Sequence, residues 1–300
     1  MTSYSAMHNK ILDGQRVADA VLSSIKKEIE SLRQRKPCLA VVLVGDDPAS
    51  AIYVKRKTKA CLETGFESIQ KIFPATVSEE ELTEYLLSLN ASSNVDGILV
   101  QLPLPAHLNQ RKITSLISPD KDVDGFHPVN LGKLVTEDSS GYVPCTPLGV
   151  KELLEASSVD LAGKHAVIVG RSTIVGKPLS LLLLQKQKGM NATVTCVHSY
   201  THDLPLIVKQ ADLVVAAIGR AEFIRGEWIK EGAVVIDVGI NRVEDASAKK
   251  GYRIVGDVEF EGALQRASLI TKVPGGVGPM TIAMLLKNTY KSYKSKGIHV

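Results

Sequence analysis

The sequence predicts an α/β protein of two domains, and three observations support this. The chain is 300 residues long, which exceeds what one small hydrophobic core usually organises. Apolar runs without polar alternation, such as Cys38–Val44 and Ala166–Val169, are typical of strands covered on both faces of a parallel sheet. Segments with helical periodicity alternate with these runs, and repeated strand–helix units are typical of α/β architecture.

The first half is expected to begin with an amphipathic helix. Apolar residues recur at spacings of four and three between Val17 and Leu32, which places them on one helix face. After the first strand, Asp47 and Pro48 have the pattern of an N-cap and a first-turn proline. A helix should therefore run from there to about Gly65.

The later elements are expected to continue this alternation. Ser78 and Glu81 have the spacing of a capping box, which predicts the start of the next helix. The hinge between the two halves is expected near Thr146–Gly149. Further strands are expected at residues 97–101, 166–169, 193–197, 213–218, 234–238 and 269–273, with helices from about Gly176 and over about Met280–Lys294.

The composition excludes several classes of protein. Hydrophobic residues make up 44% and charged residues 23% of the chain, as in soluble globular proteins. The net charge of +4 is not the basic stripe of a nucleic-acid-binding protein, and no apolar run approaches the roughly 18 residues that span a membrane. The four scattered cysteines form no C-x-x-C pair, and the N-terminus shows no targeting peptide. We therefore expect a cytoplasmic protein without a metal site.

A loop that could bind a dinucleotide follows the strand that ends at Val169. The segment Gly170-Arg171-Ser172-Thr173-Ile174-Val175-Gly176 lies between a strand and a helix. Rossmann units place backbone N–H groups there, toward a pyrophosphate. Its spacing departs from G-x-G-x-x-G, so a tight turn without a ligand remains the alternative.

The residues after the next strand favour NADP over NAD. NAD sites usually carry an acidic residue at that point, on the ribose 2′-hydroxyl, whereas no carboxylate follows Val197 before Asp203. Arg171 and Ser199 could instead bind a 2′-phosphate, because a guanidinium forms paired, charge-assisted hydrogen bonds. By itself, Arg171 would more commonly be a solvated surface charge.

Three polar residues of the first half are candidates for chemistry. Tyr53 and Lys57 are four residues apart and share a helix face. That helix follows a strand whose carboxyl end is where open α/β sheets bind ligands, and a tyrosine ring there could pack on an aromatic ligand. Lysine residues act as bases where burial and neighbouring cations lower their pKa. Spacing alone favours a basic solvated face. Gln101 ends a buried strand, so its amide should emerge on the same rim as Lys57.

Two loops complete the set of candidates. Lys121–Pro128 contains Asp124 beside Gly125, a pattern typical of a turn, although in a cleft such an acid could accept paired N–H donors from an amino-pyrimidine ring. The loop Val273–Pro279 holds three glycines, which permit close approach of a ligand to the backbone. The sequence contains neither a histidine cluster for a metal nor a G-x-S-x-G hydrolase motif.

Taken together, these segments resemble the bifunctional methylenetetrahydrofolate dehydrogenase/methenyltetrahydrofolate cyclohydrolase family over nearly the whole chain. Several long motifs occur in the family's order, which argues against a chance similarity. The motifs are residues Val44–Ser50 with Tyr53 and Lys57, Gln101–Pro105, Lys121–Pro128, Pro144–Pro147, Gly170–Ser172, Asp237–Asn241 and Pro274–Thr281.

The resemblance implies two activities and an architecture. A dehydrogenase step would pass a hydride from the methylene carbon of 5,10-methylenetetrahydrofolate to NADP⁺, and a cyclohydrolase step would add water to the methenyl product to give 10-formyltetrahydrofolate. Residues 1–148, with the C-terminal helix at about 279–300, would form the folate-binding catalytic domain. Residues 149–278 would form a Rossmann-like NADP-binding domain, with the folate cleft between the two and a homodimer joined through the cofactor domains.

The resemblance also implies roles for individual residues. Lys57 would transfer the proton of the water step with Gln101 hydrogen-bonded to it, Tyr53 would stack on the aminobenzoyl ring, and Asp124 would anchor the pterin. The other implied substrate contacts are Val100, Leu102, Pro274, Gly275, Gly276 and Pro279. The implied cofactor contacts are Gly170, Arg171, Ser172, Ile174, Ser199 and Ile240.

Two departures from the family pattern are visible. Lys272 stands where the family usually has proline, and Tyr200 stands where a basic residue is common, which removes one possible 2′-phosphate contact. Since the sequence ends at Val300, we expect no synthetase domain of the kind found in longer trifunctional relatives. A dehydrogenase without the second activity and a non-catalytic NADP-binding relative are the alternatives. The retention of Lys57 and Gln101 argues against the first, and the retention of Lys57, Asp124 and the glycine loop argues against the second.

Overall fold

The computed structural model describes residues 10–297 and has the predicted α/β class. It consists of two compact units. One comprises the residues up to Ala18 and Thr146–Thr281, and the other comprises Asp19–Cys145 and the residues from Ile282 onward. We call them the six-stranded unit and the three-stranded unit, after their main sheets. The N-terminal segment interpreted above lies almost entirely outside the described residues.

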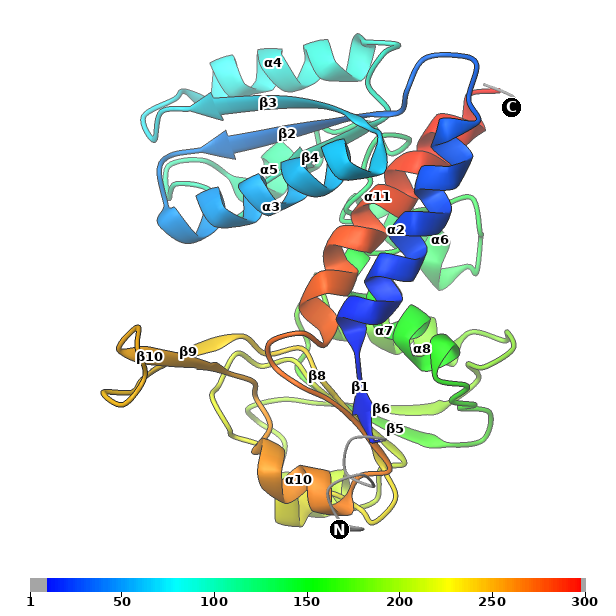
Figure 1. Cartoon of the computed structure of the whole chain (residues 1–300), viewed down its shortest axis with the longest axis vertical. Coiled ribbons are helices and arrows are strands. Elements are labelled where there is room, and N and C mark those ends of the chain that lie inside the picture. The colour runs from blue at the N-terminus through cyan, green and yellow to red at the C-terminus, as the bar shows by residue number, and fades with distance from the viewer. Residues whose placement is uncertain (1–9, 298–300) are drawn as a thin grey trace. The chain divides into compact units, whose positions relative to one another are not determined.

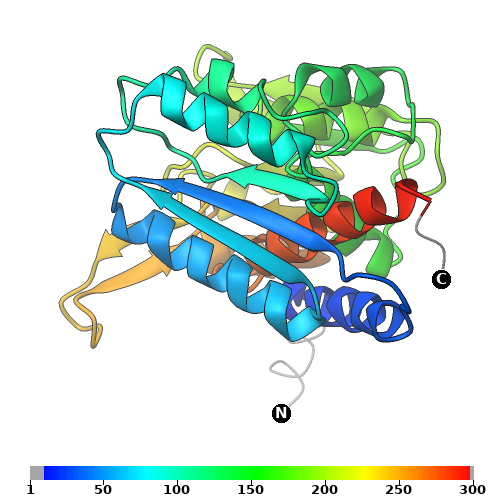
Figure 2. The same cartoon turned by 90° about the horizontal axis from the view of Figure 1, so that it is seen from above.

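The three-stranded unit is built on a parallel sheet with the order β3-β2-β4 (Figure 1). β2 (Cys38–Val44) is buried at every position and pairs with β3 (Glu67–Phe73) and β4 (Gly97–Val100). Helices α3 (Pro48–Thr64) and α4 (Glu79–Ala91) lie on opposite faces of this sheet (Figures 1 and 2). The uninterrupted apolar run of β2 therefore has the two-sided cover that was predicted from it.

Both predicted helix starts are confirmed. The Asp47 carboxylate accepts a hydrogen bond from the backbone N–H of Ser50 at 2.7 Å, and the Ser78 hydroxyl accepts one from the backbone N–H of Glu81 at 3.1 Å. α3 ends at Gly65, whose φ of 90° is left-handed and is readily adopted by glycine.

Four further helices involve the three-stranded unit. α5 (Gln110–Thr114) and α6 (Pro128–Val135) lie wholly within it. α2 (Gly14–Glu30) and α11 (Val277–Ser295) contribute residues to both units. In its three-stranded part, α11 buries Tyr293 completely, and the Tyr293 hydroxyl donates to the backbone oxygen of Arg35 at 2.8 Å.

The six-stranded unit has a parallel sheet with the order β1-β11-β8-β7-β5-β6. The chain passes from β5 to β6 on one side and then crosses to β7 on the other, so the strand order reverses between β5 and β7. Open α/β sheets bind ligands beyond the carboxyl ends of the strands at such a point. The strands are β1 (Ile11–Leu12), β5 (His165–Val169), β6 (Thr193–Val197), β7 (Leu213–Ala216), β8 (Val234–Asp237) and β11 (Leu269–Thr271).

The other elements of this unit are helices and one hairpin. Thr146–Gly149, expected as a hinge, lies in the first turns of a helix, where the Thr146 and Thr281 hydroxyl oxygens are 3.3 Å apart. The elements are α7 (Cys145–Ala156), α8 (Gly176–Leu184), α9 (Leu204–Val208), the 3₁₀ helix η1 (Gly226–Trp228), α10 (Phe260–Arg266) and the antiparallel strands β9 (Asn241–Glu244) and β10 (Tyr252–Val255).

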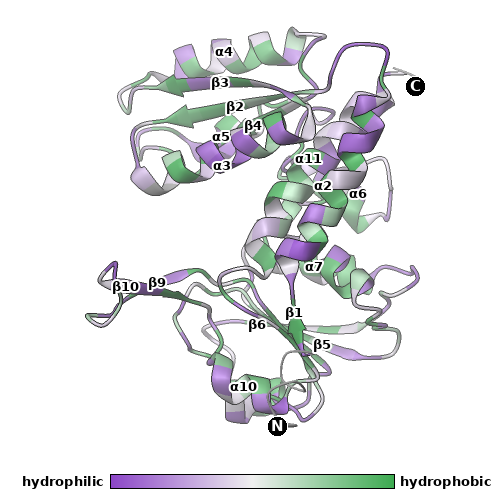
Figure 3. Ribbon diagram, viewed as in Figure 1, coloured by the Kyte–Doolittle hydropathy of each residue, from purple (hydrophilic) through white to green (hydrophobic). Residues whose placement is uncertain are grey.

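β3, β1 and the β9–β10 hairpin were not predicted from the sequence. β3 is an edge strand with mostly exposed, polar positions, and Figure 3 shows this hydrophilic character beside the hydrophobic β2. The predicted strands at 213–218, 234–238 and 269–273 are real but end two, one and two residues earlier, respectively. Beyond β7 and β8, the backbone N–H groups of Ile218 and Gly239 donate to the carboxylates of Asp257 and Asp237 rather than to a neighbouring strand.

Candidate active site

Helix α3 carries Tyr53 and Lys57 one turn apart. Tyr53 is 37% exposed and Lys57 is half-buried, although Lys55 and Arg56 between them are exposed. The lysine is therefore partly withdrawn from water, unlike the cations beside it. If this helix face were only a solvated basic surface, Lys57 would be as exposed as Lys55 and Arg56.

Gln101 contacts Lys57 directly. The Lys57 ammonium donates to the side-chain oxygen of Gln101 at 3.0 Å, and the Gln101 side-chain amide donates to the backbone oxygen of Leu102 at 2.8 Å. The backbone N–H of Gln101 continues the sheet by donating to Val42 at 2.8 Å. Both ends of the carboxamide are thus held, and its oxygen faces the lysine.

Asp122 organises the loop that carries Asp124. Its carboxylate accepts hydrogen bonds from the backbone N–H groups of Phe126 and His127 at 3.2 and 2.8 Å and from the Asn130 amide at 2.8 Å. Burial, opposed by these donors, raises the pKa of Asp122 to about 6. Gly125 has a φ of 79°, and a Cβ there would lie 2.6 Å from the backbone nitrogen of Pro144, so this position requires glycine.

Asp124 interacts with Lys57 and with a residue that the sequence analysis did not select, Cys145. Burial raises the pKa of Asp124, while the charge of Lys57 and a hydrogen bond to the Cys145 side chain act in the opposite direction. Burial also raises the pKa of the Cys145 thiol well above its usual range, and the Asp124 charge adds to this. Cys145 is therefore a neutral thiol near the carboxylate. Its place in the Pro144–Pro147 motif was the signal that could have identified it.

The side chain of Asn288, in α11, is hydrogen-bonded to the segment that precedes Asp124 and to the segment that precedes Cys145. Its side-chain amide donates to the backbone oxygens of Val123 and Val143 at 2.8 and 3.1 Å, and the Cys145 thiol donates to the same Val123 oxygen at 3.4 Å. Asn288 is 4% exposed. The segment before Asp124 and the segment before Cys145 are consequently held by one buried amide.

In the six-stranded unit, the Gly170 loop has the geometry of a phosphate loop. Gly170 has a φ of 129°, and a Cβ on it would lie 2.3 Å from the backbone oxygen of Ala217. A Cβ on Gly176 would lie 2.1 Å from the Gly170 oxygen. The Ser172 hydroxyl accepts from the backbone N–H groups of Val175 and Gly176 at 3.1 and 3.3 Å. The loop is compact because two positions lack side chains, which fits a dinucleotide pyrophosphate at the start of α8.

The residues selected for the 2′-phosphate follow neighbouring strands. Val169 of β5 pairs with Val197 of β6, so the loops that carry Arg171 and Ser199 leave the sheet side by side. Arg171 and Ser199 are exposed, as a contact to a bound phosphate requires. Tyr200, which stands where a basic residue is common in the family, is 79% exposed.

Two predicted folate contacts, Gly275 and Gly276, lie in a tightly packed turn. A Cβ on Gly276 would lie 2.6 Å from the backbone oxygen of Lys272, and Gly275 has a φ of 105°. These two positions therefore require glycine. Ile240, after β8, is 53% exposed, and Ile174 is 44% exposed.

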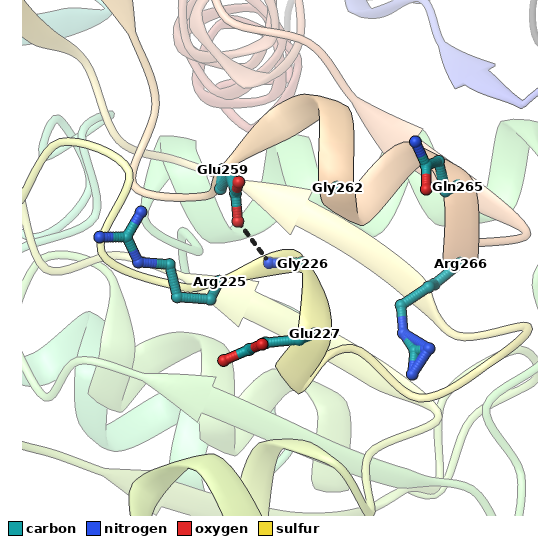
Figure 4. A pocket seen from close by; sticks show the side chains of 7 residues that line it. All are labelled: Arg225, Gly226, Glu227, Glu259, Gly262, Gln265 and Arg266. Carbon is teal, nitrogen blue, oxygen red and sulfur yellow. Dashed lines mark hydrogen bonds between the residues drawn. The ribbon is translucent and has the colours of Figure 1, made fainter.

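A surface pocket lies between η1 and α10, away from these candidates (Figure 4). The Glu259 carboxylate in it accepts a hydrogen bond from the backbone N–H of Gly226 at 2.9 Å. Its lining residues are Arg225, Gly226, Glu227, Glu259, Gly262, Gln265 and Arg266. Among residues 10–297, no group of histidine, cysteine and acidic side chains could hold a metal ion. In the same range, no helix is both long and apolar enough to cross a membrane.

Comparison with known proteins identifies the family. The model of the tetrahydrofolate dehydrogenase/cyclohydrolase catalytic domain matches residues 12–124, and that of the tetrahydrofolate dehydrogenase/cyclohydrolase NAD(P)-binding domain matches residues 144–297. The chain belongs to the tetrahydrofolate dehydrogenase/cyclohydrolase family. The predicted family, the α/β class with two domains and the nicotinamide dinucleotide cofactor are therefore confirmed.

Relatives of this family match nearly the full chain. The "Bifunctional protein FolD" of Protochlamydia amoebophila is 51% identical over 291 residues, which is 97% of this chain and 100% of that protein. The crystal structure of bifunctional FolD from Campylobacter jejuni has a TM-score of 0.90 at 47% identity, covering 95% of this chain and 99% of that one. FolD of Trypanosoma brucei, complexed with NADP cofactor and an inhibitor, has a TM-score of 0.89 at 42% identity, covering 96% and 98%.

Proposed function

We propose that this protein is a bifunctional enzyme of one-carbon folate metabolism. It oxidises 5,10-methylenetetrahydrofolate to 5,10-methenyltetrahydrofolate with NADP⁺ and then hydrolyses the methenyl product to 10-formyltetrahydrofolate. The observation that carries this proposal is the hydrogen bond between Lys57 and Gln101 beside Asp124, in a chain that matches both domains of the family. A dehydrogenase without the second activity would have no need to keep the hydrogen bond between Lys57 and Gln101, because that pair serves the water step.

The cyclohydrolase step uses the three-stranded unit. Water adds to the electrophilic methenyl carbon, and a C–N bond of the ring then opens. Of the two protons of the water, one leaves to solvent and the other passes to the released nitrogen. Lys57 carries this proton, because its Nζ is half-buried and held by the neutral carboxamide of Gln101. Asp124 binds the N–H donors of the pterin, and Tyr53 stacks on the aminobenzoyl ring.

The dehydrogenase step depends on positioning. NADP⁺ supplies the hydride acceptor, so the chain has to hold the two reactants and exclude water. Gly170 and Ser172 hold the pyrophosphate, Arg171 and Ser199 hold the 2′-phosphate, and Ile174 and Ile240 provide apolar contacts. The absence of an acidic residue after β6 favours the phosphorylated cofactor over NAD.

The remaining assignments belong to the same proposal. Residues 1–148, with the helix at about 279–300, form the folate-binding domain, except for β1 (Ile11–Leu12), which pairs with β11 of the six-stranded sheet. Residues 149–278 form the NADP-binding domain. Further contacts to the folate come from Val100, Leu102, Pro274, Gly275, Gly276 and Pro279. The enzyme works in the cytoplasm as a homodimer, and it acts on neither nucleic acid nor membranes.

A coupled absorbance assay tests this proposal. Purified protein is mixed with methylenetetrahydrofolate and either NADP⁺ or NAD⁺, and the signals of reduced cofactor and of methenyltetrahydrofolate are followed separately. NADPH formation with little methenyl accumulation is expected. Accumulation of the methenyl product would favour a dehydrogenase without the second activity, and no turnover with either cofactor would favour a non-catalytic NADP-binding protein.

A further inference from the structure

Asp257 is a buried carboxylate that neither activity uses directly. It is completely buried and accepts four hydrogen bonds. Three come from the consecutive backbone N–H groups of Ile218, Gly219 and Arg220 at 2.7, 2.9 and 2.9 Å, and one comes from the side-chain amide of Asn241 at 2.8 Å. Four donors match the roughly four lone-pair directions of a carboxylate. Asp257 therefore fixes the backbone of a whole turn.

The turn that Asp257 holds follows β7, at the point where the strand order of the sheet reverses. The backbone N–H of Ala217 donates to Val169, the last residue of β5, at 2.8 Å. The Ala217 oxygen occupies the space where Gly170 would carry a Cβ. The 218–220 turn is therefore continuous with the phosphate loop, and displacing it would change the shape of the dinucleotide site.

Asp257 holds a second turn, which follows β8 and carries the exposed Ile240. Gly239 packs so closely that a Cβ on it would lie 2.2 Å from the Asp257 Oδ1 atom. Asn241, on the other side of Ile240, donates to that same oxygen. Ile240 is thus presented by a turn that packs against Asp257 at Gly239 and is hydrogen-bonded to Asp257 through Asn241.

A second buried carboxylate keeps Asp257 in place. Asp237 accepts from the backbone N–H groups of Asp257 and Val258 at 2.9 and 2.8 Å and from Gly239 at 2.9 Å. The backbone N–H of Asp237 donates to the Thr271 hydroxyl at 2.8 Å. These contacts join the ends of β8 and β11 to the segment that carries Asp257.

The position of the 2′-phosphate contact indicates in which direction the bound dinucleotide extends across the sheet. Ser199, which is assigned to the 2′-phosphate, follows β6 on one side of β5. The other half of the dinucleotide must then extend toward β7 and β8, which lie on the other side of β5. The two turns anchored by Asp257 are the turns that follow these two strands.

We propose that Asp257 is a positioning residue for the nicotinamide half of the cofactor, acting through the 218–220 turn and Ile240. This inference rests on the proposed function for the identity of the cofactor. It implies that Asp257 affects NADP⁺ binding and hydride transfer and leaves the water step unchanged, because Lys57 and Gln101, which carry out that step, belong to the other unit.

The test compares Asp257→Asn with wild type in three measurements. The dissociation constant of NADP⁺ is measured by calorimetry, the dehydrogenase KM for NADP⁺ and for methylenetetrahydrofolate by absorbance, and the cyclohydrolase rate on supplied methenyltetrahydrofolate without cofactor. Replacing one acceptor oxygen by an N–H₂ group opposes the turn's own N–H donors. We expect the dissociation constant and the KM for NADP⁺ to rise by about tenfold or more, with the folate KM and the cyclohydrolase rate unchanged.

Glu259→Gln is the matched control. Glu259 lies two residues further along the same segment and accepts one backbone hydrogen bond, from Gly226 in the surface pocket (Figure 4). The substitution removes the same charge while keeping an acceptor oxygen, so NADP⁺ binding should stay at the wild-type value. An equal loss in both variants would overturn the proposal, since the effect would then come from net charge.

A milder variant, Asn241→Ala, keeps the proposal testable if Asp257→Asn does not fold. It removes one of the four donors and leaves the three backbone contacts of Asp257. Weaker NADP⁺ binding with an unchanged cyclohydrolase rate supports the proposal. Wild-type NADP⁺ affinity in a folded variant of either kind overturns it. Failure of the proposed function is recognised separately, because wild-type protein would then bind NADP⁺ without turning over methylenetetrahydrofolate.

Discussion

Lys57 and Gln101 are 44 residues apart in the sequence, yet the lysine Nζ lies 3.0 Å from the glutamine Oε1. The carboxamide is itself fixed, because its nitrogen donates to the backbone of Leu102. A carboxamide carries no charge and takes up no proton near neutral pH. The contact therefore holds the lysine Nζ in place without competing for the proton that the water step requires.

The first prediction concerns Lys57→Met. This substitution keeps much of the side-chain volume and removes the amine, so the rate of methenyl ring opening should fall by about a hundredfold or more. NADP⁺ binding should be unchanged, since the Gly170 loop belongs to the other unit. The methenyl absorbance measures the first effect, and calorimetry measures the second. Lys59→Met is the matched control on the same helix, where Lys59 pairs only with the exposed Glu63 at 3.6 Å. Normal ring opening in Lys57→Met would contradict the assigned role.

The second prediction concerns Arg171→Ala. Loss of a charged hydrogen bond to the 2′-phosphate costs about 1.5–3 kcal/mol, so the KM for NADP⁺ should rise by about ten- to a hundredfold. The KM for NAD⁺, which lacks this phosphate, should stay the same. Lys164→Ala removes an equal charge just before β5, at the amino end of the strand and away from the loop that carries Arg171. It should affect the KM of neither cofactor. Equal increases for NADP⁺ and NAD⁺ in Arg171→Ala would mean that Arg171 does not recognise the 2′-phosphate.

Local sequence patterns predicted the strands that are buried on both faces of a sheet and the helices that begin with a capping residue. The run Cys38–Val44 lies between two helices, and Asp47 and Ser78 cap helices as expected. β1 could not be predicted, because a two-residue strand has no periodicity and its partner β11 lies near the other end of the sequence. β3 was not predicted for a different reason. It is an edge strand with mostly polar, exposed residues, and its edge position is defined only once the sheet has assembled.

Some residues of the candidate site could likewise be predicted from the sequence, and others could not. Lys57, Gln101 and Asp124 stand in motifs that can be recognised in the sequence. Asp257 stands in no recognised motif, and Cys145 is marked only by its place in the Pro144–Pro147 motif, because the contacts of both residues are with segments distant in the sequence. A cysteine next to proline and an aspartate next to valine carry no local sign that one meets Asp124 and the other meets three backbone N–H groups of a distant turn.

The third prediction concerns the stability of the three-stranded unit. Asp96 is completely buried and accepts from both terminal nitrogens of Arg35 at 2.7 Å, from Lys296 at 2.8 Å and from the backbone N–H of Cys38 at 2.9 Å. Burial opposes ionisation of Asp96, but the hydrogen bonds from Arg35 and Lys296 outweigh it and lower the pKa.

Asp96→Ala leaves the Arg35 guanidinium without its carboxylate. Removal of one partner of a buried ion pair costs about 3–5 kcal/mol, so the urea midpoint of unfolding should fall clearly. Lys59→Ala, which removes an exposed pair, should leave the midpoint within error. Circular dichroism in urea measures both. Equal midpoints for wild type and Asp96→Ala would show that the Asp96 network does not stabilise the fold.

The last prediction is a pH dependence that arises from Asp122. Burial raises its pKa from 3.8 to about 6 in the folded protein. Between these values the folded state binds more protons than the unfolded state, so stability falls as the pH rises. The contribution is complete below about pH 4 and lost above about pH 6, and a shift of about two pH units corresponds to on the order of 3 kcal/mol.

Asp122→Asn cannot ionise and retains an acceptor for the loop, so it isolates this contribution. The free energy of unfolding is measured in urea at intervals between about pH 4 and 7 for both proteins. The wild type should lose stability relative to the variant across this range, because groups common to both, such as Asp237 with its pKa raised to about 6, cancel in the difference. Parallel curves would mean that the folded protein leaves the Asp122 carboxyl as acidic as it is in the unfolded chain.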